Sequence, residues 1–233
     1  MRTKLTAVTV LCASLVLGAA VAQAGPVTIA LYTFQSQGDV LAFLKQAGAK
    51  CTKKWSDNMA MRINVGPGTN SCAFRSSVVG DSTDPGSDME ISATAVSSAP
   101  RPLQKKAYVG VGARISETAG YELRVRSTAR TWQLFRDPKG SAGPTLFRSG
   151  KGKFIRMGAK PNALLLRAFD YGSTNTQLIA TVNGKAVVTA TDGAADQPDG
   201  RRSTVRVGAK GTGSGDGIAG TFDNVAIKVP NPF

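Results

Sequence analysis

Apolar and polar side chains alternate along most of the chain beyond residue 58. In one such segment, Leu123 and Val125 alternate with the charged residues Arg124 and Arg126. Successive side chains of a strand point to opposite faces, so this pattern is typical of antiparallel strands with one face on a core. The pattern predicts strands over residues 59–65, 72–79, 89–96, 108–116, 121–127, 131–137, 162–169, 176–182, 185–191, 203–209 and 221–229.

Turn-forming residues separate these segments. Asn183-Gly184 predicts a tight hairpin, because a type I′ turn needs positive φ at both central positions. Eleven short strands without a second helical region predict an all-β protein, a sandwich of two antiparallel sheets. Further clusters rich in Gly, Pro, Asp or Ser lie at 81–88, 97–102, 137–144 and 193–200.

One segment near the N-terminus has helical periodicity instead. Apolar residues recur at helical spacing within 35–50, where Ser36 or Asp39 can cap the start and Gly48 can end the helix. We expect a short N-terminal helix in a segment, 25–57, that packs on a sandwich domain formed by residues 58–233. The apolar stripe consists of Val40, Leu41, Phe43, Leu44 and Ala47.

The first 24 residues have the pattern of a secretory signal peptide. Arg2 and Lys4 precede an apolar run over 5–21, and Ala22-Gln23-Ala24 provides the small residues of a cleavage site. A retained membrane anchor is the alternative, but the run is short and no stop-transfer flank follows it. We expect a secreted protein, extracellular or associated with the cell wall, with no membrane span after signal removal.

Cys51 and Cys72 are the two cysteines beyond the signal peptide, because Cys12 leaves with it. An even pair in an oxidising compartment predicts a disulfide. Chain-entropy estimates give such a cross-link about 3 kcal/mol of stabilisation.

The composition is basic and lacks histidine. The 233 residues include 29 Lys and Arg against 15 Asp and Glu, for a net charge of +14. Loss of Arg2 and Lys4 with the signal peptide leaves +12 on the mature domain. The absence of histidine excludes imidazole bases and imidazole metal ligands, and with them Ser-His-Asp and Cys-His catalysis.

The order of motifs in the second half of the chain resembles that of the concanavalin A-like lectin/glucanase superfamily, including its laminin-G-like domains. This resemblance covers about residues 58–229 and implies a jelly roll. It leaves the function open, because the superfamily hosts lectins, glycosidases, lyases and adhesive modules. The motifs are a GxGxRI strand at 110–115, GYELRV at 120–125, WQLFRD at 132–137, Pro161-Asn162, VNGK at 182–185 and FDNVAIKV at 222–229.

The resemblance implies a carbohydrate-active enzyme as one alternative. A glucanase of this fold needs an acid and a nucleophile on one strand face. Asp88 and Glu90 come nearest, but Ser92 occupies the third alternate position and an exposed strand is the favoured explanation of the pair. A lyase could use Tyr121, yet alternation points Tyr121 away from Arg124. We therefore assign no catalytic residues.

The aspartates of one turn-rich loop are candidate calcium ligands. Asp192, Asp196 and Asp199 fit the oxygen chemistry that calcium prefers, although aspartate is also an ordinary turn residue. No other cofactor is expected.

Arginines on the non-core positions of four strands are the remaining feature. If those strands are neighbours, the guanidinium groups form one patch that suits carboxylate, sulfate or phosphate groups. The sequence thus predicts a monomeric, non-catalytic binding module for a glycan or an anionic cell-surface polymer; a solvated basic exterior is the alternative. Secretion argues against nucleic acid. The candidate binding residues are Arg114, Arg124, Arg126, Arg167 and Arg206, with Glu122 paired to Arg124.

Overall fold

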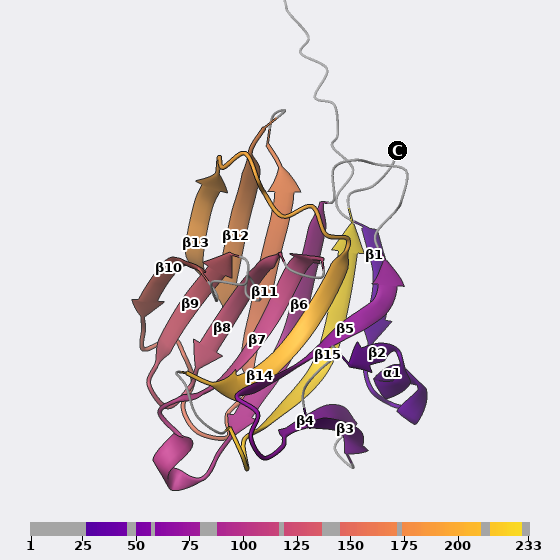
Figure 1. Cartoon of the computed structure of the whole chain (residues 1–233), viewed down its shortest axis with the longest axis vertical. Helices are drawn as coiled ribbons and strands as arrows, with labels where there is room; N and C mark the ends of the chain where they lie inside the picture. Colours follow the sequence, from indigo (N-terminus) through magenta and orange to yellow (C-terminus); the bar gives the residue numbers. More distant parts are fainter. Residues whose placement is uncertain are drawn as a thin grey trace, which may run out of the picture.

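Two antiparallel sheets pack face to face in the computed structural model (Figure 1). The prediction of an all-β jelly-roll sandwich with a short helix is confirmed. The expected signal peptide lies outside the described residues, and within those residues no helix is long and apolar enough to cross a membrane. The structure describes residues 27–45, 50–56, 59–79, 88–116, 119–136, 145–171, 174–210 and 215–229.

Sheet A has the strand order β13-β12-β11-β6-β15-β4-β3, and β1 pairs with the far end of β15. The turn between β12 and β13 is the predicted hairpin, with φ of 52° at Asn183 and 77° at Gly184. The strands of this sheet are β1 (Val27–Tyr32), β3 (Cys51–Ser56), β4 (Ala60–Val65), β6 (Met89–Ser98), β11 (Asn162–Asp170), β12 (Thr176–Val182), β13 (Lys185–Asp192) and β15 (Ala219–Val229).

Sheet B has the order β10-β9-β8-β7-β14-β5-β2 and faces the viewer in Figure 1. The central strand β7 pairs with β8 on one side and β14 on the other. Its strands are β2 (Phe43–Lys45), β5 (Ser71–Val79), β7 (Ala107–Ile115), β8 (Tyr121–Arg126), β9 (Thr131–Arg136), β10 (Thr145–Lys151) and β14 (Arg202–Ala209).

The core lies between the two sheets and consists of the alternating apolar residues of both. All eleven predicted strands are present, with bounds shifted by at most two residues. The alternation did not indicate β1, β2, β3 and β10. β3 and β10 are largely exposed or half-buried along their length. An edge strand of this kind is held by backbone hydrogen bonds, which leave little imprint on the side-chain pattern.

The N-terminal helix is much shorter than the sequence predicts. Helix α1 covers only Gln37–Leu41, and the chain then enters β2, which pairs with β5. Phe43 is fully buried, whereas Leu44 is about half exposed. Sheet pairing that buries Phe43 therefore replaces the helix at Phe43–Lys45, since tertiary packing overrides local propensity. The expected helix end at Ala47 and Gly48 lies outside the described residues.

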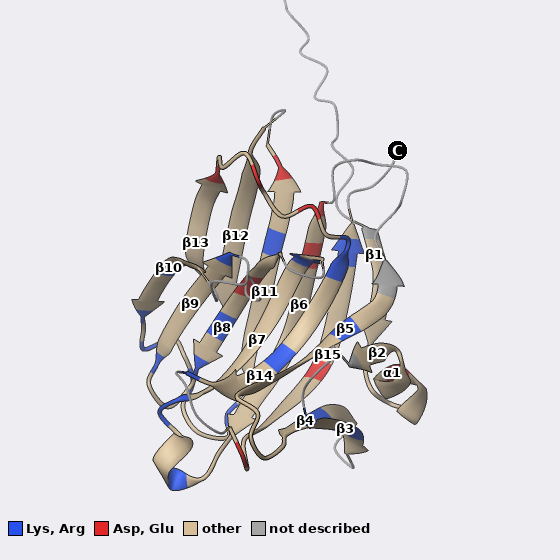
Figure 2. Ribbon diagram, in the orientation of Figure 1, with Lys and Arg blue, Asp and Glu red and all other residues tan. Residues whose placement is uncertain are grey.

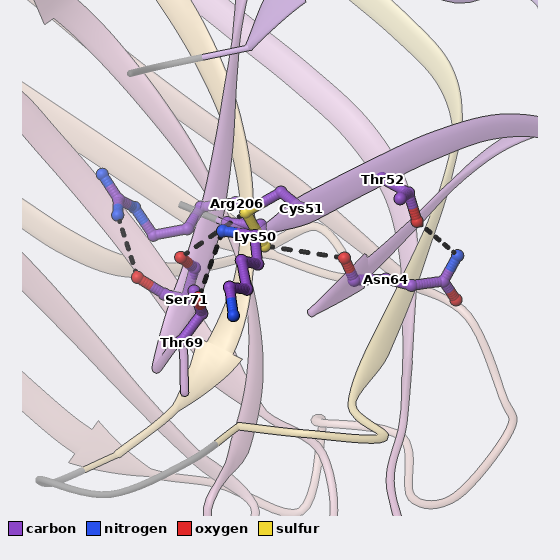
Figure 3. Close-up of a disulfide and its surroundings, with 8 residues drawn as sticks. Lys50, Cys51, Thr52, Asn64, Thr69, Ser71 and Arg206 are labelled. Atoms are coloured by element: carbon purple, nitrogen blue, oxygen red, sulfur yellow. Dashed lines mark hydrogen bonds between the residues drawn. A yellow bond between two sulfur atoms is a disulfide. The ribbon is translucent and has the colours of Figure 1, made fainter. Parts of the chain in front are cut away.

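The disulfide between Cys51 and Cys72 is present and joins β3 of sheet A to β5 of sheet B (Figure 3). The two Cα atoms are 5.7 Å apart. Because β1 and β3 belong to sheet A and β2 to sheet B, the described part of the predicted N-terminal segment contributes strands to both layers.

Candidate functional site

The outer face of sheet B carries four arginines and one glutamate on neighbouring strands. Strand pairing places Arg206 opposite Gly110, and Gly110 opposite Arg124. Glu122 and Arg126 lie on the same face of β8, two residues to either side of Arg124. We call this set, Arg75, Glu122, Arg124, Arg126 and Arg206, the arginine face; blue segments mark its strands in Figure 2.

Glu122 binds two arginines from strands on either side of β7. Its Oε1 accepts a hydrogen bond from Nε of Arg124 at 2.6 Å, and its Oε2 accepts one from Nε of Arg206 at 2.7 Å. The glutamate is fully buried. The sequence predicted the pair with Arg124, but not that Arg206 would complete it.

Two glycines of β7 make this bridge possible. Gly110 and Gly112 lie directly between the strands that carry Glu122 and Arg206. A Cβ at Gly110 would stand 2.8 Å from the carbonyl oxygen of Leu123 and 3.4 Å from Oε1 of Glu122. Side chains from the flanking strands therefore lie over bare backbone, which any larger residue would obstruct.

Arg124 is also held between two aromatic rings. Its guanidinium lies 4.8 Å from the centroid of Tyr108 and 4.3 Å from that of Phe135. Both rings are buried but lie outside the core cluster, whereas Trp132 of the same strand as Phe135 belongs to it. Trp132 and Phe135 thus lie on opposite faces, as alternation predicts. The cation–π contacts fix the orientation of Arg124.

The electrostatics of Glu122 follow from this enclosure. Burial by itself would raise the pKa of its carboxyl, but the charges of Arg124 and Arg206 and their hydrogen bonds hold that pKa below its ordinary value. The carboxylate therefore stays ionised and neutralises part of the surrounding positive charge.

Arg206 is anchored at its other end near the disulfide. Its Nη1 donates a hydrogen bond to Oγ of Ser71 at 3.2 Å, and Ser71 precedes Cys72 (Figure 3). The cross-link between the sheets thus lies beside the outermost contact of the arginine face.

Arg75 and Arg126 are the less restrained cations of this face, and both are half-buried. Their Nε atoms lack a hydrogen-bond partner, as do the hydroxyls of Thr204 and Thr131. Strand pairing sets Arg75 opposite Thr204 and Arg126 opposite Thr131. These Nε and hydroxyl atoms are themselves buried, so the parts of Arg75 and Arg126 that an anionic ligand can contact are the exposed parts of the two half-buried side chains. We call the two cross-strand pairs the unsatisfied sites.

The structure corrects the predicted position of Arg114. This residue is buried, donates to Oγ1 of Thr176 at 2.8 Å and forms salt bridges with Asp170 and Asp88. Its φ of 54° coincides with an irregularity in the β7–β14 pairing. The irregularity breaks the alternation and turns Arg114 towards residues of sheet A instead of the arginine face.

Arg167 also lies away from the arginine face. It belongs to β11 of sheet A, and its Nε lies 3.8 Å from Oε2 of Glu90. Nζ of Lys228 lies 3.0 Å from the other oxygen of that glutamate. Of the five predicted arginines, the fold therefore brings together Arg124, Arg126 and Arg206.

Two of the candidate calcium ligands form salt bridges with an arginine of β9. Arg136 lies 3.3 Å from Asp192 and 2.7 Å from Asp196, and the hydroxyl of Tyr121 donates to Asp192 at 2.7 Å. Among the described residues no group of three or more Cys, Asp or Glu side chains could hold a metal ion. Calcium binding by Asp192, Asp196 and Asp199 stays a prediction, and two of these carboxylates already bind a guanidinium.

The same contacts bear on catalysis. Glu122 is the single carboxylate of the arginine face, and a lowered pKa suits it poorly to act as a general acid. Tyr121 is buried in the core, and burial followed by its bond to Asp192 raises its pKa. The arrangement can bind an anion, but it does not bring together an acid and a base among these residues.

Arg75 and the two threonines were missed by sequence reasoning. Alternation within 72–79 already places Arg75 on the same face as Ala73, so the face itself could have been inferred. The strand that lies beside β5 could not be inferred, because its neighbour β14 is more than 120 residues away in the chain.

Comparison with known proteins supports the fold. No protein-family model matches the sequence, and no curated protein matches it. The carbohydrate-binding module CBM66 from Bacillus subtilis is similar in structure, with a TM-score of 0.57 and 13% identity, over 80% of this chain and 95% of that one.

Two further structures are similar. An endo-1,3-beta-glucanase from Streptomyces sioyaensis has a TM-score of 0.57 and 11% identity, over 89% of this chain and 98% of that one. A lectin from Bauhinia forficata in complex with GalNAc has a TM-score of 0.53 and 10% identity, over 88% and 100%. At these identities the similarity shows the fold alone, the two-sheet jelly roll that the sequence predicts.

Proposed function

We propose that this protein is a non-catalytic binding module that holds an acidic glycan or another anionic surface polymer on its arginine face. The observation that carries the proposal is that Arg75 and Arg126, one at each unsatisfied site, are half-buried and form no salt bridge with a described residue. A guanidinium group matches the oxygen acceptors of a carboxylate or sulfate. With four arginines and one glutamate, the face has a net charge of +3.

The residues of the face divide into two roles. Glu122, Arg124 and Arg206 bind one another and form a fixed floor. Arg75 and Arg126 are the groups that contact the ligand. This division keeps the floor in place when ligand is absent, so little order has to be gained on binding.

The spacing of the two unsatisfied sites favours an extended ligand. β5 and β8 are separated by two strands, a lateral distance of about 14 Å at the usual strand spacing. The sites are also offset by four residues along the strands, about 13 Å. A single sugar does not reach both, whereas a chain of several acidic sugars does.

The fold is compatible with this proposal. The similar structures include one named as a carbohydrate-binding module and one as a lectin in complex with GalNAc. An extracellular or wall-associated location, reached after removal of residues 1–24, would bring the face into contact with such polymers.

Chromatography on immobilised polymers tests the proposal. The mature protein is passed over dextran sulfate, alginate and neutral dextran, each eluted with a salt gradient. We expect retention on one or both anionic polymers that salt abolishes, because screening weakens exposed ionic contacts. Arg75→Ala combined with Arg126→Ala is expected to weaken binding about tenfold or more, since each loses charge-assisted hydrogen bonds.

A matched variant on the other sheet supplies the control. Arg167→Ala combined with Lys228→Ala removes the same charge from the outer face of sheet A. We expect this variant to lose less than half as much binding free energy as the variant that lacks Arg75 and Arg126. Equal losses in both variants would mean that net charge alone drives retention. Release of reducing ends from a glycan substrate would contradict the non-catalytic assignment.

A further inference from the structure

A second candidate site lies at one end of the sandwich, where four segments line an open cavity of about 220 Å³. The segments are the end of β6, the 3-10 helix η1 (Arg101–Leu103) with the start of β7, the β8–β9 turn, and the connection from β10 to β11. Most of its lining side chains are small. The lining consists of Ser97, Ser98, Ala99, Gln104, Ala107, Thr128, Gly158 and Ala159.

The lining offers neutral hydrogen-bonding groups. Ser97, Ser98 and Thr128 provide hydroxyls, and Gln104 provides a carboxamide. These groups both donate and accept, as the hydroxyls of a polyol do. At about 30 Å³ per water molecule the cavity has room for about seven waters, which is close to the size of one sugar unit.

Lys and Arg residues are frequent in the connections at this end of the sandwich. We call the connections at this end (66–70, 99–106, 127–130, 152–161, 183–184, 210 and 215–218) the basic end. Its described residues include eight Lys or Arg and one acidic residue, Asp216. The connections at the opposite end hold Asp88, Asp196 and Asp199, and Figure 2 shows red at the upper ends of β11 and β13 but blue around η1. The eight cations are Arg101, Lys105, Lys106, Arg130, Lys153, Arg156, Lys160 and Lys210.

The cations flank the lining residues in the sequence. Lys105 and Lys106 follow Gln104, and Arg130 lies two residues beyond Thr128. All eight are exposed or half-buried, and within the described segments none of them forms a salt bridge. The Nε of Arg130 is buried without a hydrogen-bond partner. The cluster therefore produces a positive potential that no internal carboxylate offsets, apart from Asp216.

We propose that this cavity binds one sugar-sized polyol that carries a phosphate or sulfate group. The neutral lining receives the sugar hydroxyls, and the surrounding Lys and Arg side chains receive the oxyanion. This site shares no residue with the arginine face, although Thr128 lies in the turn that follows Arg126, and the inference does not rest on the proposed function. A terminal unit of a polymer and a free sugar phosphate share this chemistry.

Calorimetric titration with four probes tests the site: glucose 6-phosphate, glucose 6-sulfate, glucose and inorganic phosphate. We expect at least one charged sugar to bind, and glucose and inorganic phosphate each to bind about tenfold or more weakly, because each satisfies half of the site. Amide chemical shifts at Gln104 and Thr128 should move on binding. Equal binding of inorganic phosphate would identify a non-specific cation cluster and overturn the proposal, as would no binding of either charged sugar.

Three variants locate the binding. Lys105→Ala with Lys106→Ala removes charge beside the cavity, and Ala159→Trp fills it from an exposed position; each should weaken the charged sugar about tenfold. Arg75→Ala on the arginine face should leave it unchanged. Unaltered affinity in both cavity variants would overturn the proposal.

The polymer and sugar assays fail independently. If the protein binds the charged sugar but is not retained on the polymers, the proposal for this cavity is supported and the proposal for the arginine face is contradicted. A denaturation midpoint measured for each variant separates lost binding from lost folding. If an acidic oligomer with a charged terminal unit binds more tightly than the free sugar, the source is the polymer end.

Discussion

The arginine face and the basic end are both cationic, but their charges are arranged in different ways. On the arginine face, Glu122 bridges two guanidiniums and aromatic rings hold one of them. At the basic end eight cations accompany one aspartate, most of them exposed. Paired, buried charge fixes local geometry at a desolvation cost, whereas unpaired exposed charge creates an attractive field with little effect on stability. Arginine side chains thus stabilise the local structure of the arginine face, whereas at the basic end Lys and Arg mainly create a field that attracts anions.

Of the changes considered, removal of the carboxylate shared by Arg124 and Arg206 should have the largest effect on stability. Glu122→Ala leaves Arg124 and Arg206 without their buried counter-charge, and we expect a loss of about 3–5 kcal/mol in the free energy of unfolding. Urea denaturation measures it. Glu90→Ala is the matched control on sheet A, where the partner cations are about one-third exposed, and should cost much less. A loss under about 1 kcal/mol for Glu122→Ala would mean that the bridge is not structural.

Adding a methyl group beneath the bridge should have an intermediate effect. Gly110→Ala places a Cβ 2.8 Å from a backbone oxygen, so the strands must shift, at a cost of about 1–3 kcal/mol. Gly38→Ala in α1, where the Cβ would meet only Oγ of Ser36 at 3.4 Å, is the control and should not destabilise. Similar denaturation midpoints for the two variants would contradict the role assigned to Gly110.

Acid should weaken the arginine face and not the basic end. The pKa of Glu122 is lower in the folded protein than its ordinary value of 4.5. Its contribution is therefore complete above about pH 4.5 and is lost as the pH falls through the lowered folded value. Denaturation midpoints of the wild type and Glu122→Gln, measured from pH 7 to pH 3, should converge on acidification. A constant difference would show that the ionised carboxylate is not the stabilising species.

Removal of cations from the basic end should have the smallest effect on stability. Lys105→Ala with Lys106→Ala is expected to change the free energy of unfolding by less than about 0.5 kcal/mol, because neither side chain forms an ion pair with a described residue. Chemical denaturation gives the value. A clear stabilisation would instead indicate that repulsion within the cluster is substantial, and a marked loss would show an architectural role for these lysines.

The candidate site was only partly predictable. Alternation placed Arg124, Arg126 and Arg206 on non-core positions, and pairing in the structure brings them to one face. The same rule failed at Arg114, where a pairing irregularity and a positive φ reverse the direction of the side chain. Alternation correctly placed Arg167 on a non-core position, but it could not show that the strand of Arg167 belongs to sheet A and not to sheet B.

By itself, the sequence determined the features that depend on neighbouring residues. These are the eleven alternating strands, the Asn183-Gly184 hairpin and the separation of Trp132 from Phe135 onto opposite faces. The pairing of Cys51 with Cys72 also followed, because only two cysteines remain beyond the predicted signal peptide. Each of these follows from local backbone geometry or from elimination, so no knowledge of the fold is needed.

The tertiary structure alone decided what depends on contacts between distant segments. It set β14 beside β7, so that Arg206 reaches Glu122 across two glycines of β7. It also brought four distant segments together around a pocket lined by small, neutral side chains, at the end of the sandwich where Lys and Arg are frequent. It also ended the expected helix at Leu41 and formed β2 from Phe43–Lys45, because pairing with β5 buries Phe43. Strand order is fixed by the packing of the whole core, and alternation along one strand carries no information about its neighbour.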